Sequence, residues 1–193
     1  MLETIILKIN LQPHDFIASG GTRDVYHYPL KSDRCIKIQQ KKGDFNRNEK
    51  EFYLGAAKNS IIPLFFGEVN TNYGRGIVVE IIRDFDHSIS LSLLDYIKKG
   101  GITKKHARAI IEKIGLILIK NKLLLHDAGL QNILLKKDKN GNFSPVVIDG
   151  LGEKHRTFNY LLRLWFPALR LIKTRKKLSR LLEKLENEYL HNL

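Results

Sequence analysis

The stretch between residues 103 and 150 constrains the fold of this chain most, because a helical period gives way there to an extended one. Thr103 is suited to cap a helix, and apolar residues recur after it at intervals of three and four: Ala107, Ile110, Ile111, Ile114 and Leu118. Short apolar runs at 132–135 and 145–148 then flank Asn140-Gly141, a strong signal for a β-hairpin. A core helix followed by a hairpin predicts an α+β protein.

The first 82 residues are expected to form a small sheet that carries one helix. Gly20-Gly21 interrupts an extended stretch and marks a turn between two strands. Further extended runs occur at 35–38, 62–69 and 76–82, and a helix-favouring run lies at 48–57. We therefore predict an antiparallel sheet domain at 1–82 and a short, mainly helical domain at 83–193.

The formal net charge of +13 is concentrated at the C-terminus, where residues 154–193 hold ten Lys and Arg against three Glu. Such a patch favours an anionic partner: a membrane surface, an acidic substrate or nucleic acid. The single cysteine, Cys35, excludes an internal disulfide. The start of the chain lacks the pattern of a signal peptide and no apolar run reaches about 20 residues, so we expect a cytoplasmic protein.

Four short motifs, in this order along the chain, resemble those of phosphotransferases of the protein-kinase-like superfamily. The first is Gly20-Gly21, where a loop that covers phosphates would lie, although an ordinary hairpin turn has the same pattern. The second is Lys37, at the place of the strand lysine that pairs with the α- and β-phosphates; a solvent-exposed lysine is the simpler interpretation. Its partner is expected on the next helix, with Glu49 the better candidate and Glu51 the alternative.

The most specific motif is Leu-His-Asp-Ala-Gly-Leu-Gln-Asn at 125–132. Asp127 precedes Asn132 by five residues, the spacing of the kinase catalytic loop. Phosphoryl transfer needs a carboxylate that orients the acceptor hydroxyl and a neutral oxygen ligand for Mg²⁺, roles that we assign to Asp127 and Asn132. The fourth motif is Asp149-Gly150 at the end of the hairpin, where the superfamily places its main Mg²⁺ carboxylate, although such a pair is usually a turn.

Together these segments resemble the YrbL family, which is named for a member of the PhoP regulatory network. The resemblance spans about residues 16–175 and rests on residues 26–29, 35–38, 74–86, 89–90, 132–134 and 148–152. It implies a pattern similar to that of bacterial lipopolysaccharide-core kinases and a protein-kinase-like two-lobed fold with ATP and Mg²⁺ in the cleft. It also implies a hinge at Glu80-Ile81-Ile82 that offers backbone groups to adenine; an apolar structural strand is the alternative.

Departures from the protein-kinase pattern narrow the expected activity. His126 replaces the arginine of the catalytic loop, Gly129 stands where protein kinases have a lysine, and no Ala-Pro-Glu motif follows Asp149. These departures disfavour an ordinary Ser/Thr protein kinase. The leading hypothesis is transfer of phosphate from ATP to a hydroxyl of a lipopolysaccharide-core sugar or related anionic glycolipid. The alternatives are a pseudokinase that acts as a regulatory or binding module, and an atypical protein kinase.

Residues 158–184 combine aromatic, aliphatic and basic side chains. One interpretation is a segment that lies in a bilayer interface with its cations towards anionic headgroups, which would make the protein peripheral at the inner membrane. The equally weighted alternative is a pair of helices that closes the core and exposes a basic face. Nucleic acid is the weaker candidate, because the aromatic residues cluster with leucines instead of alternating with cations.

Overall fold

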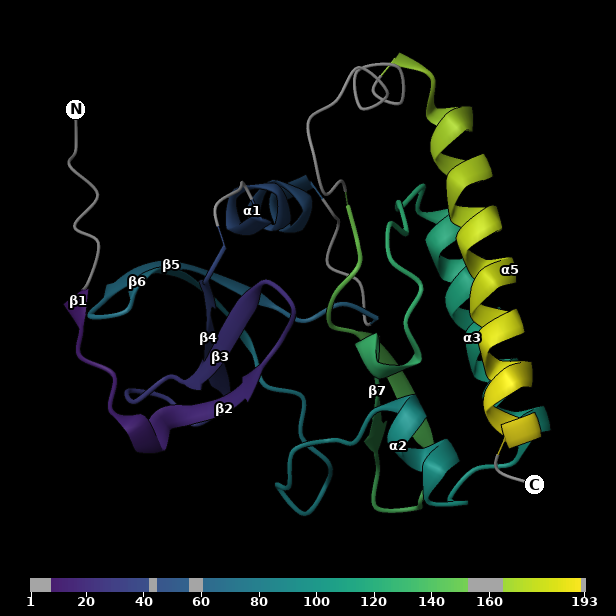
Figure 1. Ribbon diagram of the computed structural model, residues 1–193, viewed down its shortest axis with the longest axis horizontal. Helices are drawn as coiled ribbons and strands as arrows, with labels where there is room; N and C mark the ends of the chain where they lie inside the picture. Colours follow the sequence, from purple (N-terminus) through teal and green to yellow (C-terminus); the bar gives the residue numbers. More distant parts are fainter. Residues whose placement is uncertain (1–7, 42–44, 56–60, 153–164, 192–193) are drawn as a thin grey trace. The chain divides into compact units, whose positions relative to one another are not determined.

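The computed structural model describes residues 8–41, 45–55, 61–152 and 165–191 (Figure 1). They form a mixed α+β protein, so the predicted class is confirmed. The chain divides into two compact units. The first contains the described residues of 1–57 and 63–81, and the second those of 58–62 and 82–193.

The first unit is a six-stranded sheet with one α-helix. Its strands follow the spatial order β1-β5-β6-β4-β3-β2. A short 3₁₀ helix, η1 (Pro13–Asp15), separates the first two strands. The elements are β1 (Lys8–Ile9), β2 (Phe16–Ser19), β3 (Arg23–His27), β4 (Arg34–Gln39), α1 (Phe45–Gly55), β5 (Phe65–Thr71) and β6 (Gly74–Glu80).

The two faces of β4 separate two parts of the apolar core. Ile36 and Ile38 belong to a cluster on one face together with Tyr26, Val69 and Val78. Cys35 belongs to the other face, where Ile77 and Val79 pack beneath Tyr53 of α1. Because side chains alternate along a strand, Lys37 shares this second face with α1. The alternation at 35–38 thus places one lysine between the sheet and the helix.

The prediction of an antiparallel sheet is wrong at one edge, where β1 pairs with β5 in parallel. The other neighbouring strands are antiparallel. Two paired residues are too few to leave a periodic pattern in the sequence. The edge is fixed by the Asn72 amide, whose Oδ1 accepts from the Leu11 N–H (2.8 Å) and whose Nδ2 donates to the Leu11 carbonyl (3.0 Å).

The strand predicted to begin at Ile62 begins at Phe65 instead. Ile61 and Ile62 are buried and group with the second unit, and the Val147 N–H donates to the Ile61 carbonyl (2.8 Å). Pro63 between them and β5 has no N–H to offer to a ladder. An apolar run that looks like one strand therefore supplies residues to two cores.

The second unit contains helices and one hairpin. Its elements are α2 (Leu93–Lys98), α3 (Lys104–Lys120), the 3₁₀ helix η2 (Leu130–Asn132), β7 (Ile133–Lys137), β8 (Phe143–Val147) and α5 (Pro167–His191). The predicted hairpin is confirmed, with β7 and β8 paired in antiparallel register from Ile133↔Val147 to Lys137↔Phe143. Gly141 in its turn has a φ of 82°, a value that suits glycine.

Helix α3 is the core helix that its period predicts. Thr103 caps it by accepting a hydrogen bond from the His106 N–H (3.3 Å). The predicted stripe is buried throughout: Ala107, Ile110, Ile111, Ile114 and Leu118. The sequence analysis identified no helix at α2, although Ser92 and Asp95 form a capping box there, and this Ser-x-x-Asp pattern was the available signal.

Candidate functional site

Lys37 and Glu49 form a buried ion pair in the first unit. Lys37 Nζ on β4 lies 2.8 Å from Glu49 Oε1 on α1, and the two side chains are 9% and 10% exposed. The expected pair is therefore present with Glu49, while the alternative residue, Glu51, pairs with Arg47 on the surface of α1. Contact of Lys37 with a nucleotide stays a prediction.

Arg23 of β3 also pairs with Glu49, a contact that the sequence analysis missed. The signal lies in the strand register, because Arg23 pairs with Gln39 and Val25 with Lys37, so Arg23 lies on the same face as Lys37. The Glu49 carboxylate thus pairs with two cations, Arg23 and Lys37.

Cys35 precedes Lys37 by two residues on the same face of β4 but is chemically inert. Burial raises the pKa of its thiol to about 11, and Lys37 opposes this only in part. The thiol therefore stays protonated at neutral pH and is no candidate nucleophile.

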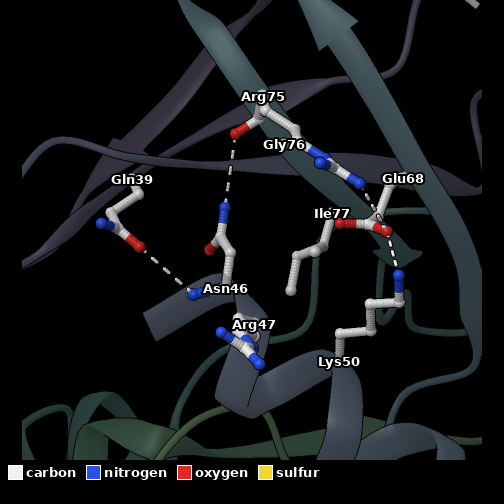
Figure 2. A pocket seen from close by; sticks show the side chains of 8 residues that line it. All are labelled: Gln39, Asn46, Arg47, Lys50, Glu68, Arg75, Gly76 and Ile77. Carbon is white, nitrogen blue, oxygen red and sulfur yellow. Dashed lines mark hydrogen bonds and ion pairs between the residues drawn. The ribbon is translucent and has the colours of Figure 1, made fainter. Parts of the chain in front are cut away.

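A polar pocket of about 440 Å³ lies on the α1 side of the sheet. Figure 2 shows Asn46 of α1 between the Gln39 side chain and the Arg75 backbone. Its Nδ2 donates to the carbonyls of Lys37 (3.1 Å) and Arg75 (3.4 Å), while its buried Oδ1 accepts no hydrogen bond from the described residues. None of the predicted nucleotide-binding residues is among the described residues that line this pocket.

The same pocket contains an ion-pair cluster that connects α1 to the sheet. Glu68 of β5 pairs with Lys50 of α1 and lies 3.0 Å from Arg75 Nη2 of β6 (Figure 2). Burial disfavours the charged carboxylate, but hydrogen bonds from Lys50 and Arg75 outweigh burial and hold the pKa of Glu68 below its ordinary value. The cluster stabilises α1 in the position at which Glu49 reaches Lys37.

The predicted phosphate-covering turn joins β2 and β3, where the Gly20 N–H donates to the Arg23 carbonyl (2.8 Å). Neither Gly20 nor Gly21 has a positive φ. A Cβ on Gly21 would meet nothing within 4 Å. The structure thus gives Gly21 open space without requiring glycine there, and phosphate binding at this turn stays a prediction.

The predicted hinge begins at the last residue of β6. The Glu80 N–H donates to the Leu64 carbonyl (2.9 Å) and the Ile81 N–H to the Asp33 carbonyl (2.9 Å). The Ile82 carbonyl accepts from the Ser90 N–H (3.0 Å). These N–H groups are already used, so any contact of Glu80 or Ile81 with adenine has to come from a carbonyl oxygen.

In the second unit, backbone hydrogen bonds bring together the three predicted catalytic residues. The N–H groups of His126 (2.7 Å) and Asp127 (3.0 Å) both donate to the Gly150 carbonyl. The Ile148 N–H donates to the Asn132 carbonyl (2.9 Å). Asp149 therefore lies between two backbone contacts, one to the residue Asp127 and one to the residue Asn132.

Gly150 makes this approach possible. Its φ is 82°, and a Cβ at this position would lie 2.4 Å from the Asp127 carbonyl oxygen. A side chain would therefore clash with the backbone of the loop that carries Asp127. The chain bends at Asp149 and Gly150, and the Gly150 carbonyl is the contact point between the end of the hairpin and the loop.

The three residues whose backbones are brought together carry oxygen-bearing side chains of the kind that binds a hard cation. Asp127 and Asp149 are exposed and Asn132 is half-buried. Carboxylate and amide oxygens are the ligands that Mg²⁺ accepts, and it usually takes one or two carboxylates together with phosphate oxygens and water. Among the described residues no group of three or more His, Cys, Asp or Glu side chains gathers as a metal site. Two carboxylates and the Asn132 amide would be enough protein ligands for Mg²⁺ if phosphate oxygens of a substrate supplied the remaining ligands.

Helix α5 supports the loop that carries Asp127. Thr174, fully buried, donates its hydroxyl to the Leu123 carbonyl (3.1 Å) and accepts from the Leu125 N–H (3.1 Å). Lys184 Nζ donates to the Ala128 carbonyl (2.6 Å). The sequence analysis assigned Lys184 to the basic C-terminal segment and missed this role, because residues 56 positions apart leave no local pattern.

One face of α5 closes the core, as one of the two interpretations of the C-terminal segment expects. Leu178, Leu181 and Leu185 are buried, and Leu178 lies against Gly115 of α3. The expectation of a helix pair concerns residues that include 158–164, which lie outside the described residues. No helix among the residues described is long and apolar enough to cross a membrane.

Comparison with known proteins places these residues in a family context. The family model of the PhoP regulatory network protein YrbL matches residues 9–186 of the chain. The chain is also similar to the uncharacterized protein YrbL of Escherichia coli (strain K12) and to that of Shigella flexneri. Each is 29% identical over 155 residues, which cover 75% of this chain and 74% of the relative.

Proposed function

The chain belongs to the family of the PhoP regulatory network protein YrbL, and we propose that it is an ATP-dependent phosphotransferase that acts on a hydroxyl group. The proposal includes a protein-kinase-like fold for its two units. The strand that bears Lys37 is followed by the helix that bears Glu49, which is the order that kinase-like resemblance implies.

One observation carries the proposal. The Gly150 carbonyl accepts from the N–H groups of His126 and Asp127, while Ile148 donates to Asn132. Three residues that the spacing of kinase motifs had selected, at positions 127, 132 and 149, thus converge at one place. Asp127 and Asp149 are exposed and Asn132 is half-buried. A purely structural turn does not require these three polar residues at one place, whereas a catalytic site does.

On the nucleotide side, Lys37 pairs with the α- and β-phosphates in this proposal. Glu49 pairs with its ammonium group and with the guanidinium group of Arg23. The carbonyl of Glu80 and the turn at Gly20-Gly21 complete the proposed contacts to ATP.

In the proposed reaction, Asp127 orients the acceptor hydroxyl and accepts its proton as the new bond to the γ-phosphorus forms. The bond between the γ-phosphorus and the β–γ bridging oxygen breaks, and ADP leaves. Asn132 and Asp149 would hold Mg²⁺, which would supply positive charge to the phosphate oxygens. Catalysis of this kind depends mostly on positioning. The backbone hydrogen bond from Asp127 to Gly150 would therefore contribute to the reaction by holding Asp127 in place.

For the acceptor we propose a hydroxyl of a lipopolysaccharide-core sugar or related glycolipid. This proposal is supported by the resemblance to lipopolysaccharide-core kinases. It is also supported by Gly129, which occupies the position at which protein kinases have a lysine beside the substrate hydroxyl. The Gln131 side chain lies where a Cβ of residue 129 would be.

The test is transfer of labelled γ-phosphate from Mg-ATP into separate glycolipid and protein fractions. Asp127→Asn should abolish the label. Glu112→Gln is the matched control, because it makes the same change from carboxylate to amide at an exposed position on α3 and should leave transfer unchanged. Melting temperatures of both variants show whether they are folded.

Each outcome assigns the protein to one class. Label in glycolipid that only Asp127→Asn removes establishes the kinase and its acceptor. Label in protein alone establishes an atypical protein kinase. Absence of label in both fractions, with stabilisation by Mg-ATP intact, contradicts phosphoryl transfer and identifies a pseudokinase.

A further inference from the structure

The outer face of α5 has an unusual combination of side chains. Ile172 lies two residues before the buried Thr174, which places it about 200° around the helix axis from Thr174. Leu169, Ile172, Lys176 and Arg180 follow one another at intervals of three and four residues, so they share this face. All four are exposed, with Leu169 at 39% and Ile172 at 60%. We call these four residues the outer face.

Two further exposed aromatic residues lie next to the outer face in the sequence. Trp165 and Phe166, just before α5, are 80% and 58% exposed. From Trp165 to Leu182 the chain has six Lys or Arg and no Asp or Glu. The first acidic residue of the helix is Glu183, so the charged side chains of this stretch are all positive.

The opposite face explains why these apolar groups are not simply core residues. Thr174, Leu178, Leu181 and Leu185 are buried, and α5 packs there against α3 (Figure 1). Leu169 and Ile172 lie on the face of α5 that does not pack against α3, so they stay exposed. Large apolar side chains at one end and cations along the same face are the composition of a helix that lies in a lipid interface.

We propose that the outer face of α5, with Trp165 and Phe166, docks the protein on the surface of an anionic phospholipid bilayer. The apolar side chains enter the interface while Lys176 and Arg180 face the acidic headgroups. Cations alone would suit nucleic acid equally well, and the exposed apolar residues at 165, 166, 169 and 172 favour the bilayer. The proposal does not depend on phosphoryl transfer.

Helix α5 would also connect the loop that carries Asp127 to the docked surface, because its two faces have different partners. Thr174 and Lys184 of α5 bond to the backbone of residues 123, 125 and 128. The same helix therefore contacts that loop through its buried face and the bilayer through its outer face.

The test is sedimentation of the full chain with vesicles of phosphatidylcholine and phosphatidylglycerol, against vesicles of phosphatidylcholine alone. We expect binding to the anionic vesicles that weakens as salt is added. Each cation near an anionic surface contributes about a fivefold change in partitioning, so Lys176→Glu with Arg180→Glu should lower binding more than tenfold. Leu169→Ser with Ile172→Ser should lower it about tenfold.

Matched controls lie on α3. Lys105→Glu with Lys113→Glu makes the same charge change at two exposed positions, and Leu116→Ser removes a leucine that is 71% exposed. These variants should bind like the wild type. Because Trp165 is the only tryptophan, its fluorescence should shift to shorter wavelengths when the anionic vesicles bind.

Three results would overturn the proposal. They are no sedimentation with anionic vesicles, an equal loss for the α3 variants, which would indicate net charge alone, or an unchanged Trp165 spectrum with vesicles in excess. Binding of single-stranded DNA that Lys176→Glu with Arg180→Glu removes, without vesicle binding, would assign the surface to nucleic acid instead. Melting temperatures equal to that of the wild type show that a loss is not unfolding.

Discussion

At the scale of single residues, Glu49 has the largest structural role among the predicted site residues. Its carboxylate pairs with both Lys37 and Arg23, and the three side chains are at most 10% exposed. The sequence motif selected Lys37 and two candidate glutamates, and only the geometry of α1 distinguishes them. Glu51 lies two residues on, so it points about 200° around the helix from Glu49.

We expect Glu49→Gln to lower the free energy of unfolding by about 3 kcal/mol, because it leaves two buried cations without their carboxylate. Urea denaturation measures the change. Glu51→Gln, whose surface pair with Arg47 is half exposed, should change it by less than about 0.5 kcal/mol. Equal losses in the two variants would contradict the pairing.

Gly150 is the second residue with a specific requirement. Gly150→Ala should lower the free energy of unfolding by about 2 kcal/mol, since a Cβ there would lie 2.4 Å from the Asp127 carbonyl oxygen and φ is 82°. Gly21→Ala is the control, because nothing lies within 4 Å of its Cβ, and it should cost less than about 1 kcal/mol. A tolerated Gly150→Ala would show that the loop does not approach this turn so closely.

At the scale of elements, α1 is held to the sheet by the cluster of Lys50, Glu68 and Arg75. The pKa of Glu68 is lowered in the folded protein, despite burial, by hydrogen bonds from Lys50 and Arg75. A carboxyl whose pKa is lower in the folded state stabilises the fold above its unfolded pKa. That stabilisation is lost as the pH falls through the folded pKa.

The difference in unfolding free energy between the wild type and Glu68→Gln should therefore be constant at neutral pH. It should shrink as the pH falls below the ordinary value of 4.5, and vanish in stronger acid. Denaturation at a series of pH values measures it. A difference that does not change with pH would mean that the amide costs stability through packing and not through charge.

The contact of α5 with the loop that carries Asp127 can be tested at Thr174. Thr174→Val removes a buried hydroxyl that bonds to the Leu123 carbonyl and the Leu125 N–H, so the free energy of unfolding should fall by about 2 kcal/mol. Ser179→Ala, at an exposed position of the same helix, should change it by less than about 0.5 kcal/mol. If both variants are equally stable, the hydroxyl is not what positions the loop.

At the scale of the whole molecule, the proposed function depends on nucleotide binding. Mg-ATP at 100 times its dissociation constant should stabilise the fold by about 2.7 kcal/mol and raise the melting temperature by roughly 5 °C or more. Lys37→Met should reduce this shift and Glu112→Gln should not, which differential scanning fluorimetry can measure. If Mg-ATP raised the melting temperature of Lys37→Met as much as that of the wild type, Lys37 would not be part of the nucleotide site.

Local patterns determined much of this protein in advance. The period of α3, the Thr103 cap and the Asn140-Gly141 turn are confirmed, because each depends on residues within a few positions of one another. The choice of Lys37 with a glutamate on the next helix came from the resemblance to short kinase motifs. The family was identified by resemblance as well, and the comparison confirms it over residues 9–186.

Only the tertiary structure decided what depends on residues far apart in the chain. It paired β1 with β5, assigned Ile61 and Ile62 to the second unit, and added Arg23 to the pair of Lys37 and Glu49. It also gave α5 a buried face against α3 and an outer face that stays exposed. These outcomes depend on strand register and on which surfaces pack against each other. The periodicity of apolar residues along the chain determines neither of them.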